Sequence, residues 1–219
     1  MKEQLRHTSL PDIPAMLPPE IIKIVQMRDP GLPNPDLVSY YMLEQDRKIY
    51  LDDEVGENVM GIHRLILRWN LEDMGKPAAE RKPIRIYIFS PGGDVDYMWS
   101  LVDLIQMSET PVITINIGVA ASAAGIIFLA GHKRLMLKRS HLLIHEGSAR
   151  MAGDAVKVMD ASENYKNQIK QMKDFILSRT KITAAALGKQ RGHDWVLDSQ
   201  YCLEHGVCDI VAEDISQVL

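Results

Sequence analysis

The strongest constraint on the fold is a regular alternation of strand-like and helix-like segments between residues 48 and 144. Short apolar runs whose composition favours strands occur at residues 48–51, 84–89, 112–117, 134–137 and 142–144. Between them, apolar residues recur at the spacing of a buried helix face over 59–69 and 98–105, and an Ala-rich helix is expected at 121–130. Strands and helices that alternate every ~25–30 residues are typical of βαβ units. The sequence therefore predicts an α/β fold with largely parallel strands.

Prolines separate an N-terminal segment from the rest of the chain. Seven of the eleven prolines lie within the first 35 residues, and none follows Pro111. Because proline interrupts both helices and strand ladders, we expect residues 1–36 to form an arm or loop, with one short helical turn near 20–27. The compact domain is expected to cover residues 37–219, with a further loop at 72–83.

A long helix is predicted over residues 154–180. Its apolar residues are three or four positions apart on one face: Val158, Ala161, Tyr165, Ile169, Met172 and Ile176. A helix of this length spans ~40 Å, which is long for a domain of this size. The single apolar stripe predicts a packing seam, either within the chain or against a second subunit.

Net charge and cysteine content exclude several classes of protein. The 219 residues carry 25 Lys and Arg against 29 Asp and Glu, a formal charge of −4, so we expect no nucleic-acid partner. Two cysteines, Cys202 and Cys208, do not make a disulfide scaffold and indicate a reducing compartment. No apolar run typical of a secretory signal follows the first residues. We therefore expect a soluble, cytoplasmic protein.

One uncharged stretch, residues 110–131, is long enough to span a bilayer. It contains Pro111, Asn116, Ser122 and many small residues. Its first half has the pattern of a buried strand and its second half that of a buried helix. We therefore expect no membrane partner.

Two turns that follow strand-like segments carry residues suited to acyl-transfer chemistry. Residues 90–93 (Ser-Pro-Gly-Gly) follow the strand at 84–89, and glycines there leave backbone N–H groups accessible to an anion. A simple tight turn is the alternative. Ser122 stands among small residues where a strand turns into a helix, whose N-terminus favours negative charge. A helix-capping or packing serine is the alternative there.

A histidine and an aspartate extend this set. His145 ends a short apolar strand and has the chemistry of a general base, although a half-buried structural histidine fits the same pattern. His141, His145 and Glu146 also suggest metal ligands, but no motif supplies a third ligand, so we expect no metal. Asp194 follows the long helix and is suited to orienting a histidine; a turn residue is the alternative.

The order and spacing of these segments resemble the proteolytic subunit of the Clp protease family, as a divergent member. The resemblance extends over roughly residues 37–211. It is carried by the blocks 47–51, 86–93, 120–125, 144–145 and 194–197. It implies the ClpP/crotonase fold, a spiral of βαβ units from which the long helix protrudes as a handle.

The resemblance also implies a role for each candidate residue. Ser122 aligns with the nucleophile, His145 with the general base, and Asp194 with the acid that orients this base. The backbone N–H groups of Gly93 and Ala123 align with the oxyanion hole. The family's chemistry implies neither a metal nor a cofactor.

By the same resemblance, the chain is a subunit of an ATP-dependent serine endopeptidase that cleaves unfolded polypeptides inside an oligomeric chamber. Such subunits form homo-oligomeric heptameric rings, single or double, and receive substrates from an AAA+ unfoldase of the Clp family. Gly192 and His193 stand where the family usually carries an acidic residue and an arginine that pair between rings, and residues 146–147 (Glu-Gly) replace its usual Gln-Pro. Two alternatives stay open: a non-catalytic structural or regulatory ring subunit, and a crotonase-like acyl-CoA enzyme.

Overall fold

The computed structural model of the chain describes residues 35–147 and 151–219. The predicted arm over residues 1–36 lies almost wholly outside these ranges and stays a prediction, as does the short helical turn at 20–27. The chain divides into two compact units, Met1–Arg47 and Lys48–Leu219. The described part of the first unit is helix α2 (Pro35–Gln45) and the turn that follows it.

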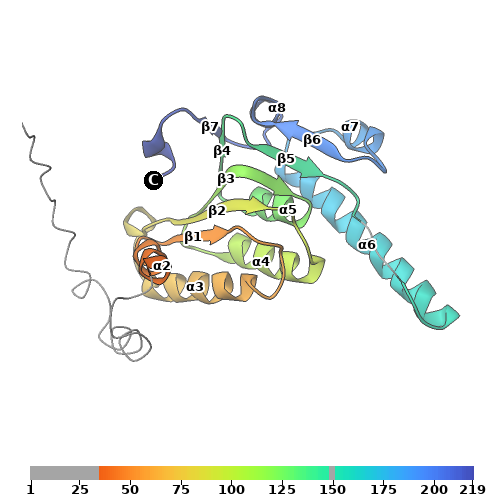
Figure 1. Cartoon of the computed structure of the whole chain (residues 1–219), viewed down its shortest axis with the longest axis horizontal. Helices are drawn as coiled ribbons and strands as arrows, with labels where there is room; N and C mark the ends of the chain where they lie inside the picture. The colour runs from red at the N-terminus through yellow and green to blue at the C-terminus, as the bar shows by residue number, and fades with distance from the viewer. Residues whose placement is uncertain (1–34, 148–150) are drawn as a thin grey trace, which may run out of the picture. The chain divides into compact units, whose positions relative to one another are not determined.

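The described residues of the second unit form a seven-stranded sheet (Figure 1). Its strands are β1 (Lys48–Leu51), β2 (Ile84–Ser90), β3 (Val112–Ala121), β4 (Lys133–Leu137), β5 (His141–Ile144), β6 (Trp195–Asp198) and β7 (Ile210–Ala212). The order is β1-β2-β3-β4-β7, while β5 pairs with both β3 and β6. These pairings are parallel except that of β5 with β6, which is antiparallel. The predicted α/β fold is confirmed.

Strand β3 is longer than predicted because it has two different partners along the same edge. Its first half, from Ile113 to Asn116, pairs with β4, and its last three residues pair with β5. The buried Asn116 joins the two halves, since its amide donates to the carbonyl of His141 at 2.9 Å and its Oδ1 accepts the Gly118 N–H at 3.1 Å. Residues 118–121, which lack a clear strand pattern, therefore continue the strand.

Helices α3 (Val59–Glu72), α4 (Val95–Met107) and α5 (Ala123–Ala130) pack against this sheet, and α3 and α4 lie along one face of β1–β3 (Figure 1). Their predicted apolar faces are buried, as with Ile66 and Leu101. All eight residues of α5 are buried, which explains the absence of charge in residues 110–131 without a membrane. In the described ranges, no helix is long and apolar enough to cross a bilayer.

The short elements between and after these helices have little periodicity, and the sequence did not predict them. They are the 3-10 helices η2 (Ala78–Glu80) and η3 (Ile215–Gln217) and the α-helices α7 (Ala184–Lys189) and α8 (Ser199–Glu204). Strands β6 and β7, with four and three residues, also escaped prediction. A three- to six-residue segment holds too few positions to define a period.

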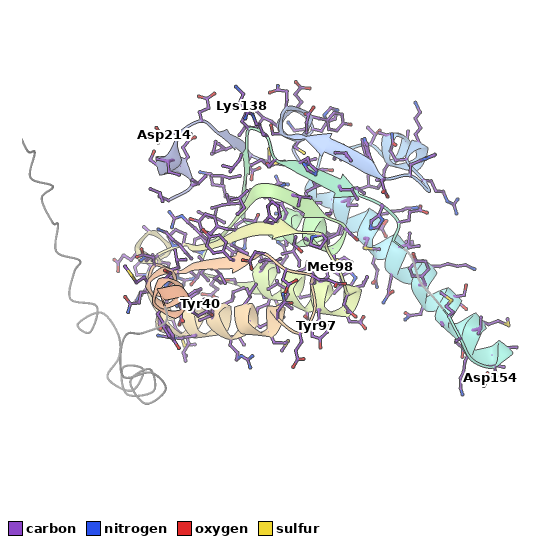
Figure 2. All side chains as sticks on the ribbon, in the orientation of Figure 1. Tyr40, Tyr97, Met98, Lys138, Asp154 and Asp214 are labelled. Carbon is purple, nitrogen blue, oxygen red and sulfur yellow. The ribbon has the colours of Figure 1, made fainter. Side chains whose placement is uncertain are left out.

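The predicted long helix is α6 (Ala155–Arg179). Asp154 caps its N-terminus, where its carboxylate accepts the Lys157 N–H at 3.0 Å; this tip is labelled in Figure 2. Of the predicted stripe, Ile176 is buried, Ala161 is exposed, and Val158, Tyr165, Ile169 and Met172 are half-buried. Beside the stripe, Val156 and Met159 are 67% and 71% exposed. The stripe is therefore fully buried only toward the C-terminal end of α6, and the helix extends away from the sheet beyond it (Figure 1).

The C-terminal residues are tied to the sheet by buried polar contacts. The Arg134 guanidinium donates to both carboxylate oxygens of Asp209, at 2.6 and 3.2 Å, and to the carbonyl of Arg179 at 2.7 Å. The hydroxyl of the buried Tyr87 donates to the carbonyl of Val218 at 2.6 Å. These bonds join β4 to α6 and to the residue before β7, and they join β2 to the chain end.

Candidate active site

The five predicted site residues lie at one edge of the sheet because of the strand pairings. Gly93 follows β2, Ser122 follows β3 and His145 follows β5; these strands are mutually parallel, so their carboxyl ends meet at one edge. Strand β6 runs the other way and begins where β5 ends, with Ile144 opposite Trp195. His145, the residue after β5, therefore comes opposite Asp194, the residue before β6.

Ser122 has an uncommon backbone conformation for a residue with a side chain. Its φ of 53° lies in the left-handed region, which costs free energy and persists only where the surroundings hold it. The Ser122 N–H donates to the carbonyl of Leu143 on β5 at 2.8 Å and so anchors the turn. The side chain makes no capping hydrogen bond. Ser122 thus occupies the N-cap position of α5 without capping it through its side chain, and the residue lines a cavity.

The glycine turn after β2 packs directly on Ser122. Gly92 has φ of 95°, and an added Cβ would lie 2.7 Å from the Cβ of Ser122. The Val55 N–H donates to the Gly92 carbonyl at 2.7 Å, and the Val55 carbonyl accepts the Asp94 N–H at 2.8 Å. These two hydrogen bonds hold the residues on either side of Gly93 in place. Within the described part of the chain, neither the Gly93 N–H nor the Ala123 N–H donates a hydrogen bond. Both donors remain available to an anion.

A cavity of about 440 Å³ opens beside these groups. Its polar lining includes Ser122, His145 and Glu146, and its apolar lining includes Val95, Ile126, Leu129, Ile144, Met172 and Ile176. A mostly apolar lining with a few polar groups and a volume of this size are typical of a ligand-binding pocket.

The imidazole and the predicted orienting acid are close but loosely held. His145 Nδ1 lies 3.6 Å from Asp194 Oδ1, and the two side chains are 32% and 71% exposed. Within the described ranges, no hydrogen bond joins Ser122 Oγ to the His145 ring. Catalytic hydrogen bonds are often long until the substrate binds, so this spacing is compatible with a Ser–His–Asp relay.

The two histidines considered as metal ligands are separated along the chain. His141 begins β5 and His145 follows its last residue, four residues or ~13 Å away along an extended chain. Two ligands of one ion need to be much closer than that. In the described parts of the chain, no group of three potential ligands is found.

Sequence reasoning missed two residues of α6 that contact the residue after His145. Lys173 Nζ lies 2.6 Å from Glu146 Oε1, and the Tyr165 hydroxyl donates to the Glu146 carbonyl at 3.0 Å. Tyr165 was predicted as part of a packing stripe, and Lys173 had no local signal. Their contact with residue 146 depends on how α6 packs against the sheet.

A parallel α/β sheet that presents a strained serine, a histidine and a glycine turn at one edge has the architecture of a hydrolase. Comparison with known proteins agrees with this class. The model of the Clp protease family matches residues 36–214. The chain belongs to the Clp protease family, a family of peptidases.

Individual relatives have modest identity but extensive coverage. The ATP-dependent Clp protease proteolytic subunit 2 of Treponema pallidum (strain Nichols) is 31% identical over 172 residues, which are 77% of this chain and 83% of that protein. The ATP-dependent Clp protease proteolytic subunit of Chlorella vulgaris is 30% identical over 197 residues, 87% of this chain and 94% of its own. The identities are those of a divergent family member, as the sequence predicted.

Proposed function

We propose that the chain is the catalytic subunit of a Clp-type serine endopeptidase, with Ser122 as nucleophile, His145 as general base and Asp194 as the acid that orients it. The observation that carries the proposal is the convergence of the ends of β2, β3 and β5 on one cavity, with Asp194, the residue before β6, next to His145. The strained φ of Ser122 supports it, because such strain is concentrated at functional positions.

In the proposed reaction, Ser122 Oγ attacks the peptide carbonyl while His145 takes the hydroxyl proton. Asp194 stabilises the imidazolium, and the Gly93 and Ala123 N–H groups stabilise the oxyanion; one such donor contributes about 3–4 kcal/mol in comparable sites. The imidazolium then gives its proton to the departing amine, which leaves an ester on Ser122. A water molecule, activated by His145, hydrolyses this ester and restores the serine.

The proposal includes an oligomeric chamber. The exposed apolar residues Val156 and Met159 on the extended part of α6 suit a contact with another subunit. We expect a heptameric ring, single or double, that receives unfolded polypeptides from an AAA+ unfoldase. The names of the relatives, which describe subunits of an ATP-dependent protease, support this expectation.

The deciding experiment is intact mass spectrometry after treatment with a fluorophosphonate. An activated serine forms an Oγ–P bond and releases fluoride, so the proposal expects one adduct on the wild-type chain and none on Ser122→Ala. Peptide hydrolysis by the wild type and its loss in Ser122→Ala would complete the assignment.

Absence of an adduct on an assembled ring, verified by native mass spectrometry, would contradict the catalytic proposal. It would favour a non-catalytic ring subunit. Retained peptide hydrolysis in Ser122→Ala would contradict the role of this serine.

A further inference from the structure

We infer that Glu146 is a positioning residue that sets the place of the His145 imidazole by anchoring the segment after β5 to helix α6. The inference rests on the proposed role of His145 as general base. It concerns the contacts of residue 146 with Tyr165 and Lys173, which lie two turns apart on one face of α6.

The first anchor is an ion pair in a partly buried place. Glu146 Oε1 lies 2.6 Å from Lys173 Nζ, and the two side chains are 26% and 36% exposed. Arg191 Nε lies 3.9 Å from the same oxygen. Partial burial reduces screening by solvent, so this pair holds its geometry better than a pair on an open surface. The pair of Lys170 with Asp174 on the same helix is of the open kind, with side chains 76% and 60% exposed.

The second anchor acts on the backbone. The Tyr165 hydroxyl donates to the Glu146 carbonyl at 3.0 Å. Gly147 follows with φ of 78°, and an added Cβ would lie 3.6 Å from that hydroxyl, so the chain turns close against Tyr165. Tyr165 and Lys173 are eight residues apart, or ~12 Å along the helix. Glu146 is thus held to helix α6 by both its backbone carbonyl and its side-chain carboxylate.

These anchors matter because, within residues 35–147 and 151–219, the one polar partner of the His145 ring is the exposed Asp194. Strand β5 ends at Ile144, and Asp194 is 71% exposed with its carboxylate 3.6 Å from the His145 ring. The peptide bond between His145 and Glu146 therefore transmits any movement of residue 146 directly to the base. A misplacement of a reacting group by about 1 Å costs about a hundredfold in rate.

The test compares Lys173→Met with Lys170→Met in the full-length protein. Both substitutions remove one lysine charge from α6, but only the first breaks the contact with Glu146. We expect the rate constant of fluorophosphonate labelling at Ser122 to fall about tenfold or more in Lys173→Met and to change less than twofold in Lys170→Met. On a chromogenic peptide, kcat should fall with little change in KM. The conservative Lys173→Arg should recover most of the rate.

The labelling experiment separates positioning from simple loss of fold. Partial unfolding lowers the fraction of chains that can be labelled, whereas a displaced base lowers the rate constant of the folded fraction. Tyr165→Phe, which removes one hydroxyl, provides an independent variant if Lys173→Met does not fold; its rate constant should fall severalfold. An unchanged rate constant in Tyr165→Phe and in any folded Lys173→Met would overturn the inference while labelling at Ser122 still supported the proposed function. No labelling of the wild type would overturn both.

Discussion

Substitution of Gly92 by alanine tests the close packing between the glycine turn and the serine. The new Cβ would lie 2.5 Å from the Ala121 carbonyl oxygen, 2.7 Å from Ser122 Cβ and 2.9 Å from the Ala123 nitrogen. Ordinary contacts begin at 3.4 Å, so relief of the closest contact, from 2.5 to 3.4 Å, requires a displacement of about 0.9 Å. The atoms that must move belong to the backbone around Ser122.

Gly92→Ala should lower the free energy of unfolding for two reasons, and their effects add. A residue with a Cβ at positive φ loses about 1–2 kcal/mol, and overpacking of a well-filled site costs about 1–3 kcal/mol. We therefore expect the free energy of unfolding to fall by about 2–5 kcal/mol. Because the displacement approaches 1 Å, the rate constant of fluorophosphonate labelling at Ser122 should fall about a hundredfold.

Gly75→Ala is the matched control. Gly75 also has positive φ, 80°, but an added Cβ would meet nothing within 4 Å. The free energy of unfolding of Gly75→Ala should therefore fall only by the cost of a Cβ at positive φ, about 1–2 kcal/mol. The rate constant of fluorophosphonate labelling at Ser122 should stay normal. Urea denaturation of both variants at one protein concentration measures the difference. If Gly92→Ala matched Gly75→Ala in both unfolding and labelling, the packing argument would be refuted.

Three further predictions concern charges and caps outside the cavity. Burial, followed by the nearby charge of Arg179, lowers the pKa of His132, whose Nδ1 accepts the Val112 N–H at 2.9 Å. The unfolded chain therefore binds the proton more readily, so stability should decline as pH falls below about 6.5, and urea midpoints of His132→Gln should show a shallower slope. Asp209→Asn weakens the partner of the buried Arg134 and should lower the unfolding free energy by about 1–3 kcal/mol in urea titrations; no loss would contradict the pairing. Asp154→Ala should speed amide exchange in the first turn of α6 severalfold without changing the urea midpoint of the whole domain.

Acid stability should also depend on Asp209. Burial alone would raise the pKa of this carboxyl, but the hydrogen bonds and charge of Arg134 outweigh burial, and its pKa lies below the ordinary value. The folded state then holds the carboxylate more firmly than the unfolded chain does, so the contribution is complete above about pH 4 and is lost as pH falls through the lowered pKa. Asp209→Asn should remove this part of the acid transition.

The fold was predictable where local patterns were strong. Runs such as residues 84–89 have the composition of a buried strand, and the spacing of Ile62, Ile66 and Trp69 defines a helix face; both elements form where predicted. The prediction failed for the second half of β3, because residues 119–121 owe their strand conformation to pairing with β5 and, at Ala120, with β2. The prediction also failed for β6, a four-residue strand that forms through its pairing with β5.

The candidate site divides in the same way. Ser122, His145 and Asp194 were predicted from their residue types at strand and turn boundaries, together with the family resemblance. Their assembly depends on registers that no local pattern specifies. The antiparallel pairing of Ile144 with Trp195 is what brings Asp194 to His145.

By itself, the sequence determined the longer strands and helices, because side-chain periodicity and backbone preference act over a few residues. It also determined which residues have the chemistry for the site. Tertiary structure alone decided that β3 has two partners along one of its edges and that Lys173 and Tyr165 hold Glu146. Such contacts join residues far apart in the chain, and they form only when burial of the whole apolar core compensates for the entropy lost in bringing them together.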